Sequence, residues 1–465
     1  MTTSRDDKRR ARRLHKARDL HDRAQHAARH QREHANAPPH AHSHRRRGIA
    51  ARFANFRTAG ASAFAAFLAV LGPGLLAGLS DDDPAGITTY SVLGTDHGYR
   101  LLWIIPASTA LLIYFHLLAV RIGAATGKGF VGVIRERWSA RWGYFAVIAL
   151  LFANFGTICA EYAGISAAAS LINIPSWLST PIAGVLISLV VVLGSFHRVE
   201  AVLLVLSSTL ALYIIDGVLA KPDWGLVLHN SIVPHLPLNQ AGWIALAATL
   251  GTTLAPWGLA FIQSYAVDKK IKVSDLRLER IDVVIGSVLT GLIGIAIAVA
   301  CAATLHRSGV HINDARDAAL ALRPLAGSFA TVLFGAGLLG ASLLAAAIVP
   351  LATAYSIAEG FGAPASLDLD SRHFQFFYAA FVGLTVAAVA IVALPGLPLI
   401  PLIYASQVVN AVLLPLHVVA LQLLGNDATI LGAARSGRWS RMVGWIGIAL
   451  IIACVGALAV SWARP

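Results

Sequence analysis

Charged residues are scarce in this sequence. Only 13% of its 465 residues are Asp, Glu, Lys or Arg, while 57% are hydrophobic and the mean hydropathy is +0.67. Soluble globular domains carry about 25% charged residues. The composition therefore excludes an ordinary soluble protein and indicates a chain that lies mostly within a lipid bilayer.

Cysteine is also rare. Cys159, Cys301 and Cys454 lie in separate apolar runs, with neither pairing nor metal-ligand spacing between them, so we expect neither a disulfide framework nor a cysteine metal site. The sequence also lacks a nucleophile, base and orienting residue at a recognisable spacing, and it has no Gly-rich phosphate loop. We therefore expect the protein not to be an enzyme and to carry no cofactor.

Residues 1–58 lack the apolar periodicity of folded segments. The first 50 residues hold 14 Lys and Arg against 5 Asp and Glu, together with 8 of the 17 His. We predict a disordered, basic, His-rich cytoplasmic tail that contacts anionic lipid, with metal buffering or sensing by its histidines as the alternative. Nucleic-acid binding is not expected, because these 50 residues contain no Phe, Tyr or Trp to stack bases. The layout of a signal peptide is absent as well.

From residue 59 to residue 465 the sequence predicts a transmembrane domain. A helix needs about 20 apolar residues to span a bilayer, and eleven runs of this kind recur along the chain. They fall near residues 63–95, 100–122, 142–172, 181–196, 199–220, 240–267, 281–305, 326–358, 374–395, 398–424 and 442–462.

Loop charges support this count and give an orientation. The second, sixth and tenth links between spans are rich in Lys and Arg, whereas the first, third, fifth and ninth contain one such residue or none. Cytoplasmic loops carry an excess of Lys and Arg. We therefore predict that the N-terminus lies inside and the C-terminus outside. The seventh link, with three Arg, is the exception, and it is fairly long.

The first span is interrupted by three carboxylates and two helix breakers. One charge at the centre of a bilayer costs about 2.5–3.5 kcal/mol on insertion scales, so three must face water, a cation or protons. Pro84 has no N–H and Gly86 relaxes the backbone, so the helix should unwind here. Unwound backbone that carries carboxylates at membrane depth indicates a cation site in a transporter. The segment reads Asp81, Asp82, Asp83, Pro84, Ala85, Gly86.

The sixth span has a second interruption, where Pro256 lies between Gly251 and Gly258. Spans 1 and 6 then hold corresponding places in two five-helix halves, 63–220 and 240–424, with 442–462 as an eleventh helix. Five spans reverse the membrane orientation of the second half, so the halves are predicted to be inverted repeats. Paired broken helices in such repeats indicate a substrate site at the midplane. Simple kinks in packed helices are the alternative.

Several motifs resemble the Nramp family of divalent-metal transporters. The resemblance runs from about residue 70 to about residue 440, with the motifs in the order of the family. It implies the fold of LeuT-type transporters, with two inverted five-helix repeats plus an extra helix, and it implies alternating access. The motifs are Gly72-Pro73-Gly74, Gly98 to Trp103, Arg121 to Gly127, Ala160-Glu161, and Gln407 with Pro415.

The resemblance also implies a set of ligand positions. In family members that carry transition metals, the dehydrated ion is bound by an Asp and an Asn of span 1, a Met of span 6 and a span 6 backbone carbonyl. Asp83 falls on the Asp and Gly86 on the Asn. Ala255 falls on the Met and Thr252 on the residue that gives the carbonyl. Asp83 and both helix breaks are kept, whereas both neutral side-chain ligands are missing.

These losses favour a hard ion. A thioether ligand prefers later transition metals, and Ala255 and Gly86 leave room for water instead. Mg²⁺ is usually held through one or two carboxylates and retained waters. The pattern is closer to the Nramp-related magnesium transporters than to the Mn²⁺ and Fe²⁺ carriers. We expect Asp81 and Asp82 to flank the ion, one of them attracting cations in the aqueous vestibule.

Other polar residues within the spans are weaker candidates. Gln263 and Gln407 are candidates to offer oxygens to the ion or its waters, with hydrogen bonds between helices as the alternative. His116 and His417 have no paired spacing, and we expect them to be core residues with satisfied nitrogens.

Proton coupling in the family uses acidic residues of span 3 and a His of span 6. Glu161 keeps one acidic position, but Ile158 and Trp257 stand where a second acid and the His would be. Neither Ile nor Trp can relay protons, so we expect weak or no proton coupling. Glu161 is either a proton carrier or a structural carboxylate bonded to span 1.

The sequence thus predicts a secondary transporter that moves Mg²⁺, and also Mn²⁺, as partly hydrated ions by alternating access. The alternatives are a proton-coupled Mn²⁺/Fe²⁺ symporter with a rebuilt site, a cation channel and a non-transporting metal sensor. We expect a multi-pass protein of a bacterial plasma membrane that functions as a monomer. Its expected partners are the divalent ion, as substrate, and the lipid bilayer.

Overall fold

The computed structural model describes residues 81–193, 212–237, 239–313, 315–320, 330–363, 375–432 and 435–463, together with Gly78 and Gly327. All of them belong to the second of two compact units, Leu71–Pro465. The predicted tail at 1–58 and most of the first half of span 1 lie outside the described residues, as do residues 194–211, which include the end of span 4 and the first half of span 5.

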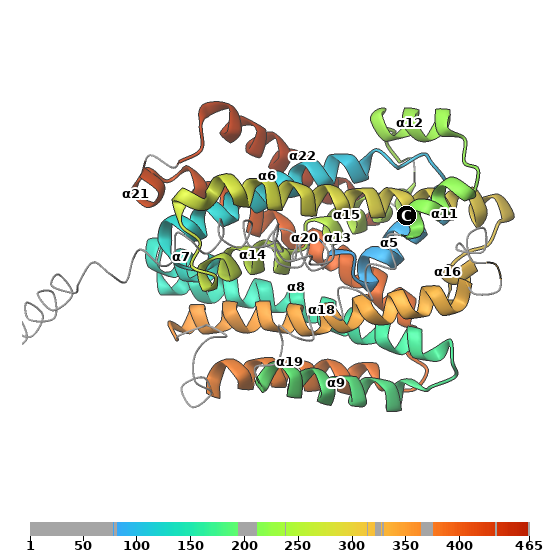
Figure 1. Ribbon diagram of the computed structural model, residues 1–465. Coiled ribbons are helices and arrows are strands. Elements are labelled where there is room, and N and C mark those ends of the chain that lie inside the picture. Colours follow the sequence, from blue (N-terminus) through green and yellow to red (C-terminus); the bar gives the residue numbers. More distant parts are fainter. Residues whose placement is uncertain are drawn as a thin grey trace, which may run out of the picture. The chain divides into compact units, whose positions relative to one another are not determined.

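Within the described ranges the regular secondary structure is helical throughout, as the apolar runs predict (Figure 1). Seven helical segments there are long and apolar enough to cross a membrane, and two shorter apolar helices accompany them. The α-helices are α5 (Pro84–His97), α6 (Ile104–Thr126), α7 (Phe130–Arg137), α8 (Ala140–Ser170), α9 (Ser176–Val192), α11 (Leu212–Leu219), α12 (Trp224–Ile232), α13 (Gln240–Thr253), α14 (Pro256–Asp268), α15 (Leu276–Thr304), α16 (Ala315–Ala319), α18 (Ala330–Phe361), α19 (Gln375–Val392), α20 (Leu399–Asn426), α21 (Ala428–Leu431) and α22 (Arg438–Ala463).

The helices depart from the predicted spans in two respects. α9 begins at Ser176 and contains Pro181, where the sequence predicts a boundary. Pro181 lies early in the helix, so its missing N–H forfeits one hydrogen bond, to the carbonyl of Trp177. In addition, α7 and α12 form short helices within two links. Asp223 caps α12 by accepting a hydrogen bond from the backbone of Leu226 at 3.1 Å, a local signal that hydropathy does not register.

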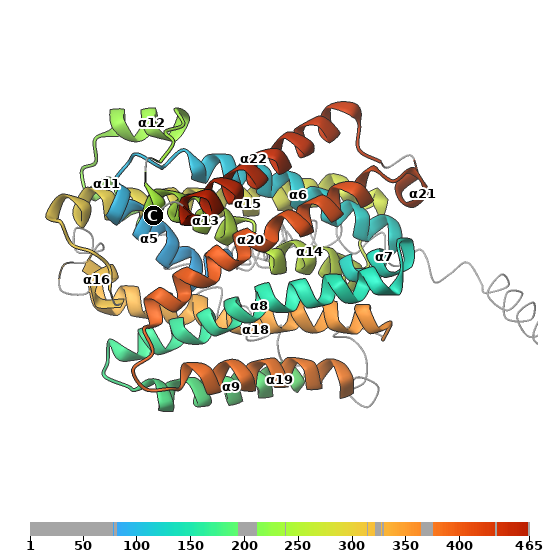
Figure 2. The same ribbon diagram turned by 180° about the vertical axis from the view of Figure 1, so that it is seen from behind.

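α5 lies at the centre of the described helices. It packs against α8, α13, α15 and α20, which explains why most of its residues are buried. α8 and α18 lie side by side, and α9 and α19 form a second pair next to them (Figure 1). The view from behind shows the same arrangement, with α20 packed on the side of α8 that is opposite α18 (Figure 2).

The peripheral helices present large apolar side chains outward. Phe152 of α8 is 70% exposed, and Val332 of α18 is 68% exposed. A soluble protein rarely exposes extensive apolar surface of this kind. In a bilayer these side chains would contact lipid, while the interior of the described part is mostly apolar and also holds buried polar groups.

Candidate metal site

α5 begins directly after the triple-Asp segment. Asp82 and Asp83 are non-helical, and Pro84 is the first helical residue. Proline fits this position because the first N–H groups of a helix have no intrahelical partner. The Asp83 carboxylate caps the helix by accepting a hydrogen bond from the backbone N–H of Gly86 at 2.7 Å. The start of α5 therefore fixes the position of Asp83.

The three consecutive carboxylates are buried together. Asp81, Asp82 and Asp83 are 2%, 3% and 4% exposed. Within the described part of the chain, Asp81 Oδ2 and both side-chain oxygens of Asp82 have no hydrogen-bond partner. A buried charge without a partner is costly. A cation with its waters would offset that cost.

The second interruption separates α13 from α14. Ala255 is non-helical, and Pro256 begins α14. In a continuous helix the carbonyl of Thr252 would accept from the N–H of residue 256, which proline lacks. The Thr252 carbonyl is therefore left for another donor or for an ion. Thr252 and Ala255 are 3% and 4% exposed.

Hydroxyl groups join the two interrupted helices. The hydroxyl oxygens of Tyr90 in α5 and Thr253 in α13 are 3.0 Å apart, and Ser108 of α6 donates to Thr253 at 3.2 Å. The end of α13 is thus tied to α5, as the predicted midplane site requires.

Glu161 of α8 faces Asp83, and the two carboxyl groups lie close enough to interact. Glu161 is fully buried, and in the described structure neither of its oxygens makes a hydrogen bond of ordinary geometry. One turn further along α8, Gly164 lies against the ring of Pro84. α8 therefore brings a fourth carboxyl group to the start of α5.

Asp81 lies next to α14 rather than next to α8. Its Oδ1 lies 3.4 Å from the point where a Cβ on Gly258 of α14 would stand. His116 of α6 reaches the same point with its Nε2, at 3.9 Å. No pattern in the sequence marks this approach, and His116 was expected to have satisfied nitrogens. Among the described residues neither of its ring nitrogens has a partner, so that expectation is not met in this part of the chain.

Gly86 has no room for a side chain in this arrangement. A Cβ there would stand 2.5 Å from the backbone oxygen of Asp81 and 3.6 Å from Asp83 Oδ1. The unwound segment turns so tightly here that only glycine fits, which explains why no Asn side chain stands at this position.

Gln263 is placed away from the interruption. Its Nε2 donates to the carbonyl of Lys128, between α6 and α7, at 3.0 Å. It follows Ala255 by about two helical turns, roughly 12 Å along the axis. Gln407 accepts from Asn410 at 3.0 Å, and Asn410 also donates to Thr157 of α8 at 2.9 Å. Gln263 thus links two segments, whereas Gln407 hydrogen-bonds within α20 and Asn410 makes the link to α8.

Direct protein ligands are few. Within the described residues, no group of three or more His, Cys, Asp or Glu side chains is arranged to hold one metal ion. An ion at this site would complete its coordination with backbone carbonyls, such as that of Thr252, and with water.

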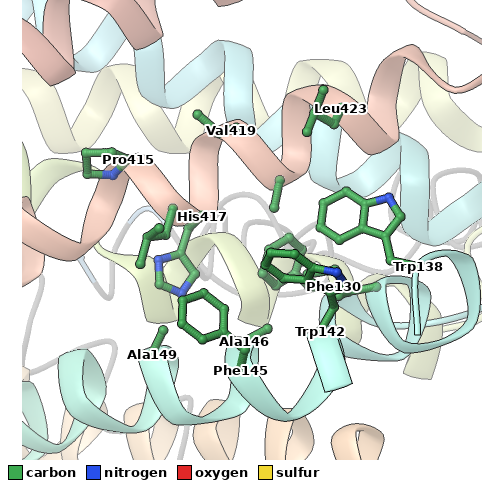
Figure 3. Close-up of a pocket in the computed structure, with 13 residues that line it drawn as sticks. Phe130, Trp138, Trp142, Phe145, Ala146, Ala149, Pro415, His417, Val419 and Leu423 are labelled. Carbon is green, nitrogen blue, oxygen red and sulfur yellow. The ribbon is translucent and has the colours of Figure 1, made fainter. Parts of the chain in front are cut away.

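An apolar cavity of about 490 Å³ lies between α7, α8 and α20. Phe130, Trp142 and Phe145 line it, and the His417 ring faces into it (Figure 3). None of the residues of the interrupted helices lines this cavity, so it is separate from the candidate metal site.

Comparison with known proteins identifies the family. Residues 74–461 match the family model described as natural resistance-associated macrophage protein-like, or Nramp. The chain belongs to the Nramp family. The motif resemblance is thereby confirmed, and the family is one of membrane transporters, not enzymes.

Two relatives support the family assignment. A Deinococcus radiodurans protein named divalent metal cation transporter MntH is 28% identical over 434 residues, which covers 90% of this chain and 95% of that protein. A Caldanaerobacter subterraneus protein of the same name is 26% identical over 306 residues, covering 63% of this chain and 72% of that protein.

Solved structures of other proteins confirm the fold. The Eremococcus coleocola manganese transporter matches with a TM-score of 0.68 at 22% identity, covering 87% of this chain and 90% of that one. MhsT, crystallised with L-phenylalanine, matches with a TM-score of 0.58 at 17% identity, covering 82% and 98%. The predicted LeuT-type fold with interrupted helices is therefore confirmed.

A polar cluster far along the chain from the triple Asp was not predicted to form. Glu359 of α18 accepts from the Ser264 hydroxyl of α14 at 2.8 Å and from the backbone N–H of Gly132 in α7 at 3.3 Å. In the sequence, Glu359 directly follows the predicted span 326–358. Three helices that are remote in sequence meet at it, and hydropathy gives no signal for such a contact.

Proposed function

We propose that this Nramp protein moves divalent metal cations across the membrane by alternating access. The main support for this proposal is one structural observation. Three buried carboxylates, with oxygens that lack partners among the described residues, stand where α5 begins, next to the interruption between α13 and α14. The relatives named divalent metal cation transporters support the same substrate class.

We assign Asp83 as the principal side-chain ligand, because the start of α5 fixes it and it faces Glu161. Asp82 supplies a second carboxylate. Asp81 supplies a third, which lies next to α14. The C-terminal end of α13 is the negative end of a helix dipole, so the Thr252 carbonyl favours a cation there. Ala255 and Gly86 line the site without giving side-chain atoms. Gln263 is left out of the ligand set because its amide binds the Lys128 carbonyl.

The transported ion is proposed to be Mg²⁺, and also Mn²⁺, in a partly hydrated form. Carboxylates, carbonyls and water suit these ions, whereas a thioether is needed to favour softer ones. No methionine stands near the interruption, since Ala255 occupies the family's Met position. The absence of a direct three-ligand cluster in the described residues fits an ion that retains water.

We further propose that transport has weak or no proton coupling. Ile158 and Trp257 are 0% and 1% exposed, and neither side chain can carry a proton into the site. The membrane potential suffices as a driving force, because moving two charges through 100 mV yields about 4.6 kcal/mol. Glu161 is then a structural carboxyl that faces Asp83.

The membrane placement follows from the loop charges and from the bacterial relatives. We propose a monomeric protein of a bacterial plasma membrane with a cytoplasmic N-terminus. Its basic tail at 1–58 contacts anionic lipid. The ion pair between Arg137 of α7 and Asp427 supports placing the second and tenth links on the same side of the membrane, as the loop charges predict.

Ion uptake into proteoliposomes tests the proposal. Purified wild type should take up Mg²⁺ and Mn²⁺ in preference to Cd²⁺, and Asp83→Asn should abolish uptake. Asp96→Asn is the matched control on the same helix, because Asp96 lies at the surface and pairs with His311 at 3.0 Å. Uptake by Asp83→Asn at the wild-type rate would overturn the site. Binding without uptake would favour a sensor, and uptake at channel rates would exclude alternating access.

A further inference from the structure

His116 is a buried imidazole that nothing in the described structure satisfies. It is 0% exposed, and neither Nδ1 nor Nε2 has a hydrogen-bond partner among the described residues. A buried polar group of this kind is normally paired with protein or water. An orphaned imidazole beside a cation pathway therefore points to a ligand.

The space next to His116 is bounded by a second unpaired group. Asp81 Oδ1 and His116 Nε2 lie 3.4 and 3.9 Å from the same point, the position of a Cβ on Gly258. Asp81 Oδ2 also lacks a partner in the described part of the chain. Because residue 258 is glycine, no side chain fills the space between the carboxylate and the imidazole.

The geometry suits one ion with a water molecule. An ion bound directly by one of these atoms reaches the other through a single ion-bound water, over a span of up to about 7 Å. The three elements involved are α6, α14 and the segment before α5. Asp83, in contrast, faces Glu161 of α8. The Asp81 carboxylate therefore lies next to α14, and the Asp83 carboxylate lies next to α8.

We propose that Asp81 and His116 form a second cation position, for divalent ions that accept a nitrogen ligand. This inference rests on the proposed function and deepens it. Imidazole suits Fe²⁺, Ni²⁺ and Zn²⁺, and Mn²⁺, the weakest binder of that series, still accepts it beside oxygen ligands, whereas Mg²⁺ prefers oxygen. The position therefore extends the range of transported ions from Mg²⁺ towards Mn²⁺, although the site has no thioether.

The variant His116→Gln removes the nitrogen but keeps a polar side chain with an oxygen ligand. The KM for Mn²⁺ uptake should rise about tenfold, as for the loss of a partner at a metal site, while the KM for Mg²⁺ should stay within about twofold. His417→Gln is the matched control, since His417 is a buried histidine that lines the separate apolar cavity.

Gly258→Ala tests the same space with both side chains in place. The added methyl group would make ordinary contacts, at 3.4 Å and 3.9 Å, with Asp81 and His116, so the fold should tolerate it. It should nevertheless displace the ion and raise the KM for Mn²⁺ as His116→Gln does. This variant keeps the proposal open to refutation if His116→Gln does not fold.

Pulsed EPR on bound Mn²⁺ gives a readout that a merely structural role would not change. Nitrogen nuclei coupled to the ion should be detected in the full-length wild type, and the coupling should fall in His116→Gln and Gly258→Ala. The histidines at 1–50 contribute equally to every variant, so the difference from His417→Gln isolates the site.

Three outcomes would overturn the second position. They are identical nitrogen coupling in His116→Gln and His417→Gln, an equal loss of Mg²⁺ and Mn²⁺ uptake, and an unchanged KM for Mn²⁺. If Asp83→Asn abolishes uptake while His116→Gln has no effect, the proposed function stands and this inference fails. If the wild type takes up no divalent ion, the proposed function fails, and the EPR comparison still decides whether His116 binds Mn²⁺.

Discussion

Pro84, the first residue of α5, lies directly against Gly164 of α8, and no methyl group fits between them. Gly164 lies one turn from Glu161 on the same face of α8. The contact therefore brings Glu161 up to Asp83. Small residues allow such close approach between helices in membranes, and here one glycine sets the distance between two carboxyl groups.

Gly164→Ala should therefore impair transport. The new Cβ would overlap the Pro84 ring and stand 2.6 Å from Ser342 Oγ, and overpacking of this kind costs about 1–3 kcal/mol. We expect Mg²⁺ uptake to fall about tenfold or more. Gly156→Ala on the same helix is the control, because its Cβ would lie 3.5 Å from Ser406 Cβ. Equal uptake by the two variants would show that the Pro84–Gly164 contact is not needed.

Gly86→Ala should disturb the unwound segment. Its Cβ would stand 2.5 Å from the Asp81 backbone oxygen, so the segment that holds the carboxylates must shift. We expect a loss of uptake with the protein still folded, as measured by flux and thermal unfolding together. Gly383→Ala of α19 has open space around it and should transport like wild type. Normal uptake by Gly86→Ala would contradict the tight turn.

Ala255→Met should shift ion preference. The buried Ala255 stands at the interruption before α14, and a thioether there adds a soft ligand. In competition experiments the ratio of Cd²⁺ to Mg²⁺ uptake should rise. Ala255→Leu has a similar volume without sulfur and separates ligand chemistry from bulk. A matching rise in the leucine variant would remove the thioether explanation.

The surface pair of Asp427 and Arg137 gives a pH prediction. Hydrogen bonds from Thr429 and then from Arg137 lower the pKa of Asp427 to about 2, from an unfolded value of about 3.9. A lowered folded-state pKa stabilises the protein above the unfolded value, and the effect is lost as the pH falls towards the folded one. Asp427→Asn should lower the Tm slightly at pH 6, because exposed pairs contribute little.

The difference in Tm between wild type and Asp427→Asn should then shrink as the pH is lowered from about 5 to about 3. Thermal unfolding in detergent at a series of pH values measures it. A difference that grows towards low pH would contradict the assigned role of Asp427.

The helix boundaries at the site could be predicted because proline and glycine act locally. Pro84 and Pro256 each begin a helix where the sequence places an interruption, and Asp83 caps α5 through a residue three positions away. The apolar runs likewise predicted most of the described spans. These signals need no knowledge of what packs against the helix.

Side-chain partners could not be predicted in the same way. Gln263 and Pro256 share α14, but only the packing of the link between α6 and α7 shows that Gln263 meets the Lys128 carbonyl. His116 and Asp81 both approach the place where a side chain at Gly258 would begin, and no periodicity in the sequence marks this. Sequence pattern gives a residue's face and depth on its helix, whereas neighbouring helices determine its partner.

Mg²⁺ uptake by reconstituted protein, driven by an inside-negative potential at equal pH on both sides, tests the central claim most directly. Internal pH is recorded throughout, and wild type is compared with Asp83→Asn. The account predicts uptake that accelerates with the potential, causes no matching acidification and disappears in Asp83→Asn. Uptake that needs an inward proton gradient and acidifies the vesicles in step with the metal, or that survives in Asp83→Asn, would contradict it.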